Sequence, residues 1–138
     1  VPFCSHFTGI DISPKTANKA KSNLSQFQNV TILCDDFLKV DFEDKQFDVI
    51  YSSLTFMHIS DKLSAIKKAS KHLKTDGVFV LSIDKNQNEA IDYGTRTITV
   101  YPDTPENIQM YAEAIGLIVE NIFESELANV LVIKNKVC

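Results

Sequence analysis

The chain has 138 residues, a hydrophobic content of 44% and a formal net charge of −4. This length is typical of one domain with a sizeable core. The mildly acidic balance argues against broad electrostatic binding to DNA or RNA, and no stretch approaches the ~20 apolar residues that span a bilayer.

The cysteines are three in number and widely spaced, at Cys4, Cys34 and Cys138, with no Cys-x-x-Cys pair. This pattern predicts neither a disulfide framework nor a metal site. It favours a reducing, cytoplasmic location.

The first elements are a strand, a helix and a second strand. Residues 8–12 (TGIDI) predict a short strand that contains an acid near its end. Ser13 is a favourable N-cap for the helix that follows, with a proline at the first helical position. Residues 30–34 (VTILC) predict the second strand, which two aspartates follow.

The most informative stretch is KQFDVIYSSLTFMHI, residues 45–59, which follows a loop predicted at 37–46. Its dense apolar run from Phe47 is typical of a strand buried on both faces. The run ends at Ser52 and Ser53, and open α/β sheets place their ligand crevice at such strand ends. An ordinary strand-to-helix crossover is the alternative interpretation.

The next pattern predicts a helix over 61–73, a turn at Asp76-Gly77 and a strand over 78–83. The expected buried face of the helix carries Leu63, Ile66 and Leu73.

The last third begins with a polar, irregular segment at 85–97 and a short strand at 98–101. Thr104 is the expected N-cap of the last helix. Residues 117–123 and 129–134 are then short strands close enough to pair as an antiparallel hairpin.

This order of elements predicts an α/β fold: a Rossmann-like three-layer sandwich with a mostly parallel sheet and a C-terminal antiparallel hairpin. We expect residues 1–138 to form a single domain.

Polar residues follow three of these strands, at Asp11, Asp36 and the pair Ser52-Ser53. Because consecutive parallel strands end at one edge, we expect the three positions to converge on one crevice. A carboxylate there can accept hydrogen bonds from the two hydroxyls of a ribose, worth roughly 1.5–3 kcal/mol each. The second acid can accept from an adenine amino group.

The apolar neighbours of the two acids, Ile12 and Phe37, can sandwich the base. The alternative for Asp11 is that it caps the following helix. Ser13 and Pro14 already suit that role, which favours the ligand interpretation.

These segments carry a family resemblance. TGIDISPKTANKAKSNL, VTILCDDF, FDVIYSSLTFMHI and LKTDGVFVLSID, in this order, resemble the small-molecule type of class I S-adenosylmethionine-dependent methyltransferases. The resemblance covers nearly the whole chain, and the combination is more specific than any one segment.

The resemblance implies S-adenosylmethionine as cofactor and a small-molecule acceptor. It implies that Asp11 binds the ribose hydroxyls, that Ile12 packs on the adenine, and that Asp36 binds the adenine amino group beside Phe37. Positions at the methionine end and the acceptor pocket are implied for Ser52, Ser53, Leu54 and His58.

The chain departs from the family in one feature. The family's first strand and the glycine-rich loop after it have no counterpart, and Gly-x-Gly occurs nowhere in the sequence. We therefore expect the natural protein to have further residues upstream of Val1, so that the domain is incomplete at this end.

Methyl transfer depends on holding the acceptor in line with the sulfonium methyl and excluding water, so it requires no nucleophilic side chain. His58 is the candidate general base, with a half-buried helix-start histidine as the alternative. Arg96 can bind an anionic acceptor or be simply solvated. No residue pattern identifies the acceptor atom.

Two other functions stay open. An acid after the second strand also marks nicotinamide-dependent oxidoreductases, although no Tyr-x-x-x-Lys dyad is present. A non-catalytic binding or scaffold domain on the same fold is the other alternative, because a fold does not fix a function.

Overall fold

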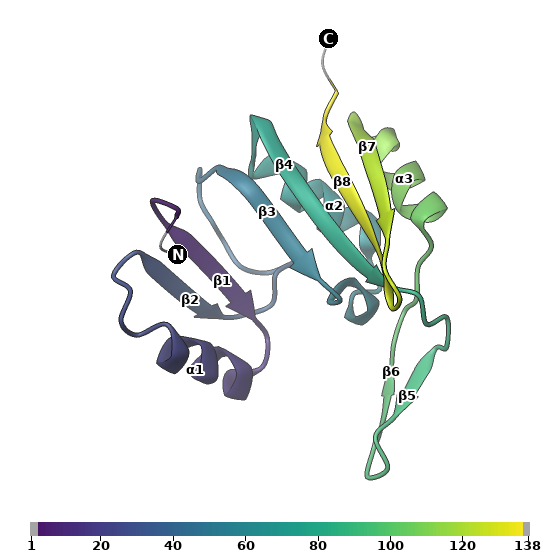
Figure 1. Cartoon of the computed structure of the whole chain (residues 1–138), viewed down its shortest axis with the longest axis horizontal. Coiled ribbons are helices and arrows are strands. Elements are labelled where there is room, and N and C mark those ends of the chain that lie inside the picture. The colour runs from purple at the N-terminus through teal and green to yellow at the C-terminus, as the bar shows by residue number, and fades with distance from the viewer. Residues whose placement is uncertain (1–2, 137–138) are drawn as a thin grey trace. The chain divides into compact units, whose positions relative to one another are not determined.

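The computed structural model describes residues 3–136, and the chain divides into two compact units. One unit runs up to Phe42 and the other begins at Glu43. Figure 1 shows the helices and strands of both units.

The first unit is a strand–helix–strand arrangement. It contains β1 (Phe7–Asp11), α1 (Pro14–Asn23) and β2 (Val30–Cys34). The two strands are parallel and pair from Phe7↔Val30 to Asp11↔Cys34. The predicted start of the helix is confirmed, because the side chain of Ser13 accepts a hydrogen bond from the backbone N–H of Thr16 and Pro14 is the first helical residue.

The second unit contains a four-stranded sheet in the order β3-β4-β8-β7 and a separate β5–β6 hairpin. Its elements are β3 (Phe47–Ser53), η1 (Phe56–His58), α2 (Lys62–Lys71), β4 (Leu73–Asp84), β5 (Ala90–Asp92), β6 (Thr97–Thr99), α3 (Pro105–Ala114), β7 (Leu117–Glu124) and β8 (Ala128–Asn135). Strands β3 and β4 are parallel. The predicted C-terminal hairpin is confirmed, and its second strand pairs antiparallel with β4.

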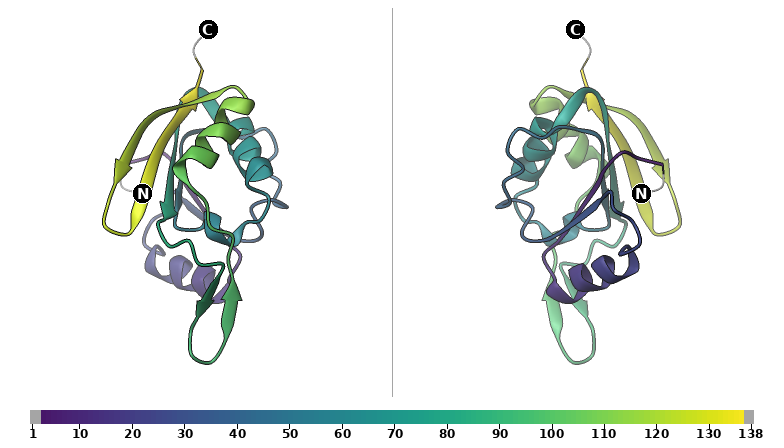
Figure 2. Two further views of the ribbon diagram at one scale, coloured as in Figure 1. Left: turned by 90° about the vertical axis from the view of Figure 1, so that its right-hand side faces the viewer. Right: turned by 90° about the vertical axis from the view of Figure 1, so that its left-hand side faces the viewer.

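The core of this unit lies between the sheet and the helices α2 and α3, which lie on one side of the sheet (Figure 2). Alternate residues of β4 face the helices, since Phe79, Leu81 and Ile83 are at most 3% exposed. Leu81 pairs with Leu131 and Phe79 with Ile133, and both partners are fully buried. Period-two alternation therefore supplies one continuous apolar layer.

Strand β3 is not buried on both faces, contrary to the prediction. Val49 is 62% and Tyr51 64% exposed. They pair with Val78 and Val80, on the face of β4 opposite to its core-facing residues. Because α2 and α3 cover the other face, alternation leaves these two side chains outside the core.

The predicted buried face of α2 is wrong at Leu63, which is 41% exposed. Ile66 is buried as predicted, and the buried place in the first turn belongs to Lys62. The helix ends at Lys71, and Leu73 begins β4 rather than ending the helix.

The predicted turn at Asp76-Gly77 is also wrong, because β4 continues through both residues. A Cβ on Gly77 would lie 2.7 Å from Cδ1 of Leu73 and 2.9 Å from the carbonyl oxygen of Lys74. The glycine therefore serves a close approach within the strand, beside a shift in the β3–β4 register.

The segment 85–97 is not wholly irregular, since it contains β5, and the short strand predicted at 98–101 is β6 at Thr97–Thr99. Gly94, with φ of 82°, makes the tight turn between them.

The core assignment predicts a contrast between two leucines of the β7–β8 hairpin. Leu131 is fully buried in the strand next to β4, whereas Leu127 is 70% exposed in the turn. We expect Leu131→Ala to lower the free energy of unfolding by about 2–5 kcal/mol, and Leu127→Ala to change it by less than about 0.5 kcal/mol. Urea denaturation measures both, and equal losses would contradict this core.

Candidate active site

Asp11 ends β1 and shapes the turn into α1. Its Oδ1 accepts a hydrogen bond of 2.8 Å from the backbone N–H of Ser13. Its carbonyl oxygen accepts from the N–H of Asp35, at the end of the neighbouring strand, over 3.1 Å. Within residues 3–136, Oδ2 accepts no hydrogen bond. One carboxylate oxygen thus orients the side chain while the other is available to a ligand.

Asp36 has a similar arrangement two residues beyond β2. Its Oδ1 accepts a hydrogen bond of 2.9 Å from the N–H of Leu38. The carboxylate of Asp35 accepts from the N–H of Asp36 over 2.7 Å. Because β1 and β2 pair through to Asp11↔Cys34, the structure brings Asp11, the last residue of β1, and Asp36, two residues beyond β2, to the same edge of this unit.

The two apolar neighbours of these acids differ in exposure. Ile12 is 70% exposed and presents an open apolar surface. Phe37 is half-buried, and its ring lies 6.2 Å from that of Phe42 at an angle of 49°. Ile12 is therefore the better placed of the two to receive a planar ligand.

In the second unit, β3 ends in a sharply defined turn. Ser52 and Ser53 pair with Leu81 and Ser82 of β4. Leu54 follows in the left-handed region with φ of 51°, and its N–H donates to the carbonyl of Ser82 over 2.9 Å. The hydroxyl of Thr55 donates to the carbonyl of Ser53 over 2.9 Å.

A left-handed conformation costs a leucine roughly 1–2 kcal/mol. Residues held in such conformations cluster at binding and catalytic sites, where surrounding hydrogen bonds maintain them. The conformation of Leu54 is therefore compatible with the binding role that the sequence suggests for the tip of β3.

His58 is the last residue of η1, and its backbone N–H donates to the carbonyl of Thr55 over 3.0 Å. It is exposed, so the half-buried helix-start alternative is wrong. In the described part of the chain its imidazole makes no hydrogen bond or ion pair. The ring is thus accessible, and its role as a base stays a prediction.

Arg96 lies on the β5–β6 hairpin, a different element from the tip of β3 (Figure 1). Its guanidinium carbon lies 5.9 Å from the ring centroid of Tyr93. The N–H of Tyr93 donates to the carbonyl of Arg96 over 2.8 Å, which closes the hairpin turn. Arg96 is exposed, so the structure leaves open both roles that the sequence suggests for it.

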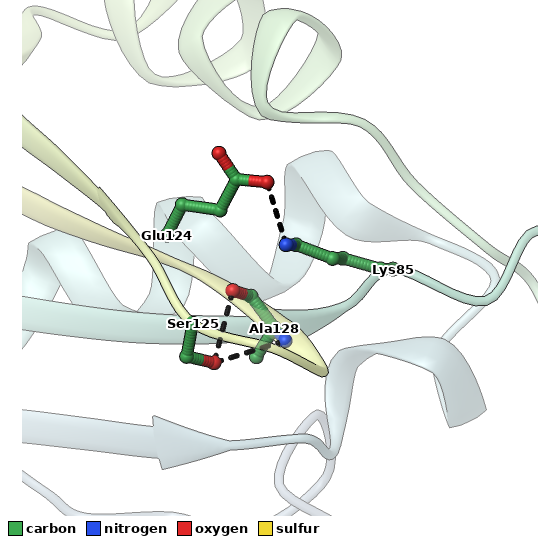
Figure 3. A network of polar contacts seen from close by, with 4 residues as sticks. All are labelled: Lys85, Glu124, Ser125 and Ala128. Atoms are coloured by element: carbon green, nitrogen blue, oxygen red, sulfur yellow. Dashed lines mark hydrogen bonds and ion pairs between the residues drawn. The ribbon is translucent and has the colours of Figure 1, made fainter.

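A polar network connects the carboxyl end of β4 to the β7–β8 turn (Figure 3). Lys85 pairs with Glu124 at 2.6 Å. The N–H of Lys85 also donates to the carbonyl of Leu127. The hydroxyl of Ser125 accepts from the N–H of Ala128 and donates to its carbonyl. The hydrogen bond from Lys85 lowers the pKa of Glu124. These contacts join β4 to the hairpin where β4 ends.

Two features escaped the sequence interpretation. The first is the buried Lys62 at the start of α2, whose pKa is lowered by burial while Asp103 acts in the opposite sense. The second is the left-handed Leu54. A lysine directly after the N-cap Asp61 is ordinary in sequence, and a leucine gives no sign of positive φ, so neither carried a usable signal.

Over residues 3–136 no helix has the length and apolar character needed to cross a membrane. The same residues contain no cluster of three or more His, Cys, Asp or Glu side chains placed to hold a metal ion.

Comparison with known proteins identifies a family. The model of a family described as "Methyltransferase domain" matches residues 2–81, which is more than half of the chain. A carboxy-S-adenosyl-L-methionine synthase of Ruthia magnifica is 30% identical over 53% of the chain and 31% of its own length. A malonyl-[acyl-carrier protein] O-methyltransferase of Bacillus anthracis is 31% identical over 56% of the chain and 28% of its own length. The match therefore spans less than a third of these curated relatives.

Solved structures show the same fold at low identity. An S-adenosylmethionine-dependent methyltransferase of Clostridium acetobutylicum superimposes with a TM-score of 0.79 at 16% identity, covering 99% of this chain and 77% of that one. A TehB-like methyltransferase of Corynebacterium glutamicum gives a TM-score of 0.72 at 20% identity, with coverages of 95% and 68%. The predicted Rossmann-like α/β fold is confirmed.

The N-cap of α2 predicts a pH dependence. Asp61 accepts hydrogen bonds from the hydroxyl and the N–H of Ser64, and these lower its pKa below the ordinary 3.8. A carboxyl with a lowered pKa contributes stability above its ordinary pKa and loses it as the pH falls through the folded-state value. Asparagine also caps helices but does not titrate.

We therefore expect Asp61→Asn to match the wild type near pH 7 and to lose less stability under acid, as followed by urea denaturation from pH 7 down to pH 2. Asp76→Asn is the control, because the Asp76 carboxylate accepts no hydrogen bond in the described residues. An acid-induced loss that is the same in Asp61→Asn and the wild type would disprove the assignment.

Proposed function

Because the chain belongs to the methyltransferase domain family, that of the class I S-adenosylmethionine-dependent methyltransferases, we propose that it carries out methyl transfer from S-adenosylmethionine to a small-molecule acceptor. The cofactor supplies a methyl group activated on a sulfonium. The task of the protein is to bind the cofactor and the acceptor, to orient them relative to each other, and to exclude water.

The donor and acceptor chemistry of the first unit suits the nucleoside part of this cofactor. Oδ2 of Asp11 accepts no hydrogen bond from the described residues, so the carboxylate can accept from the ribose hydroxyls. We assign Asp36 to the adenine amino group, which needs an acceptor. Ile12 offers the exposed apolar surface for one face of the base, with Phe37 as the second apolar neighbour. The open carboxylate oxygen of Asp11 is the observation on which this proposal rests.

We assign Ser52 and Ser53 to the methionine end of the cofactor and Leu54 to the edge of the acceptor pocket. The turn at Leu54 supports this, because Ser82 and Thr55 hold it through hydrogen bonds to the backbone. A strand end held in this way presents its backbone in one conformation before a ligand arrives, which reduces the cost of binding.

His58 is our candidate for the base that takes a proton from the acceptor. Its imidazole is exposed and carries a nitrogen that can accept a proton, as a base requires. Arg96 is the candidate for an anionic group of the acceptor. The names of the relatives differ in reaction and substrate, so they do not select one acceptor.

We propose a cytoplasmic location, which the wide spacing of the three cysteines and the lack of a Cys-x-x-Cys pair support. A non-catalytic binding domain is the second candidate function, because the sequence has no Gly-x-Gly to cradle the methionine moiety. Family membership argues against the nicotinamide-dependent alternative.

The first test is calorimetric titration of the chain with S-adenosylhomocysteine, with NAD as control ligand. Asp11→Asn keeps an oxygen for the N–H of Ser13 and replaces the open oxygen with an amide donor. We expect micromolar binding that Asp11→Asn weakens by about tenfold or more, the value of one charged hydrogen bond.

Asp44→Asn, in the exposed loop before β3, is the matched control and should bind as the wild type does. A folded chain that does not bind S-adenosylhomocysteine would refute the cofactor site and favour the non-catalytic domain.

A further inference from the structure

Lys62 is a buried lysine with a specific set of partners. It is the first residue of α2 and only 6% exposed. Its Nζ donates to the carbonyl oxygen of Phe56 and, over 2.7 Å, to that of Tyr101. The same ammonium lies 5.9 Å from the centroid of the Phe56 ring.

The two carbonyls come from segments far apart in sequence. Phe56 begins η1, the short helix that carries His58, and Tyr101 follows β6 in the segment that leads to α3. A backbone hydrogen bond of 2.6 Å from the N–H of Tyr101 to the carbonyl of Met57 joins the same two segments. Lys62 therefore holds together the exit of β3 and the base of the β5–β6 hairpin.

Two of the three other lysines of α2 show what is unusual here. Lys67 and Lys71 are exposed, as lysines normally are. Removing an ammonium from water is costly unless polar groups replace the water. Two carbonyl dipoles and an aromatic face do this for Lys62, and the negative charge of Asp103 also favours the protonated form.

The burial of the Lys62 ammonium restricts the movement of the two segments that carry its acceptors. A buried cation tolerates little displacement of its acceptors, because any separation leaves the charge without compensation. Phe56 is itself 3% exposed and packs against Phe79 of β4 at 6.4 Å between ring centroids. Lys62 and its two carbonyl acceptors, called the Lys62 clamp, are therefore fixed to the core through Phe56 and to the base of the β5–β6 hairpin through Tyr101.

We propose that Lys62 is a positioning residue that fixes η1, and with it His58, against the segment at Tyr101, so that the acceptor side of the site is formed before the acceptor binds. This inference rests on the proposed function, because only the proposed function identifies that part of the protein as the acceptor side. It assigns Lys62 no contact with substrate or cofactor.

The test is native-state hydrogen exchange of the ligand-free chain, followed by NMR. The reporters are the amides of Tyr101 and Ile59, which donate to Met57 and Phe56 respectively. In Lys62→Met, which fills a similar volume without charge, we expect both to exchange at least about tenfold faster, as loss of a charged hydrogen bond predicts. Lys62→Arg should restore much of the protection, because it retains the charge.

Two controls separate local from global effects. Amides of β8, such as that of Ile133, should keep their rates in Lys62→Met, and Lys67→Met should leave all rates unchanged. Acceleration at Tyr101, Ile59 and β8 alike would overturn the proposal in favour of a general contribution to stability. Unchanged rates at Tyr101 and Ile59 would also overturn it.

A measurement on the wild type covers the case in which Lys62→Met does not fold. In a chain labelled with ¹⁵N-lysine, the ammonium of Lys62 should give a resonance protected from solvent exchange, and that of Lys67 should not. Absence of a protected Lys62 ammonium resonance would overturn the proposal that Lys62 is a positioning residue. Calorimetry with S-adenosylhomocysteine on the same sample tests the proposed function separately, since neither exchange experiment requires a ligand.

Discussion

The pairing of β4 with β3 on one edge and β8 on the other is the interaction on which the second unit depends. The β3 pairing carries Ser53 opposite Ser82, and the same Ser82 carbonyl holds the N–H of Leu54. The β8 pairing places Leu131 and Ile133 beside the core residues of β4. Where β4 ends, Lys85 joins it to the β7–β8 turn (Figure 3). The tip of β3 is thus fixed by a strand that is itself paired on both edges, which gives a loop site a rigid support.

Much of the fold could be predicted because local chemistry and global structure agree. Residues 30–34 form β2 as predicted, because β-branched residues are favoured on the pleated, half-buried surface of a strand. Ser13 and Thr104 cap their helices because the side chain of each accepts a hydrogen bond from a backbone N–H of the first turn, and a proline at the first helical position follows each of them. Asp11 and Asp36 lie at the ends of two paired parallel strands, with Asp11 as the last residue of β1 and Asp36 two residues beyond β2.

The incorrect predictions have a common cause. At each of these positions, tertiary contacts override the local sequence pattern. The sequence pattern favours burial of the apolar Leu63 over the charged Lys62, yet Lys62 is the buried residue. Two backbone carbonyls and the ring of Phe56 compensate its ammonium group for the loss of water. Gly77 suggests a turn, but the close approach of Leu73 needs a residue without Cβ inside the strand. The backbone N–H of Leu54, which has a left-handed conformation, donates to the carbonyl of Ser82 on β4, a contact that a linear sequence does not display.

The central proposal is that Asp11 and Asp36 of the first unit, and Ser52 and Ser53 of the second, contact the cofactor of a methyltransferase. The measurement that tests it most directly is an NMR titration of the ¹⁵N-labelled chain with S-adenosylhomocysteine, which reports on each backbone amide. We predict that the largest shift changes occur at Ile12, Leu38 and Leu54, each next to or bonded to an assigned residue. Shift changes confined to the β5–β6 or β7–β8 hairpin, or no change at all, would contradict the claim.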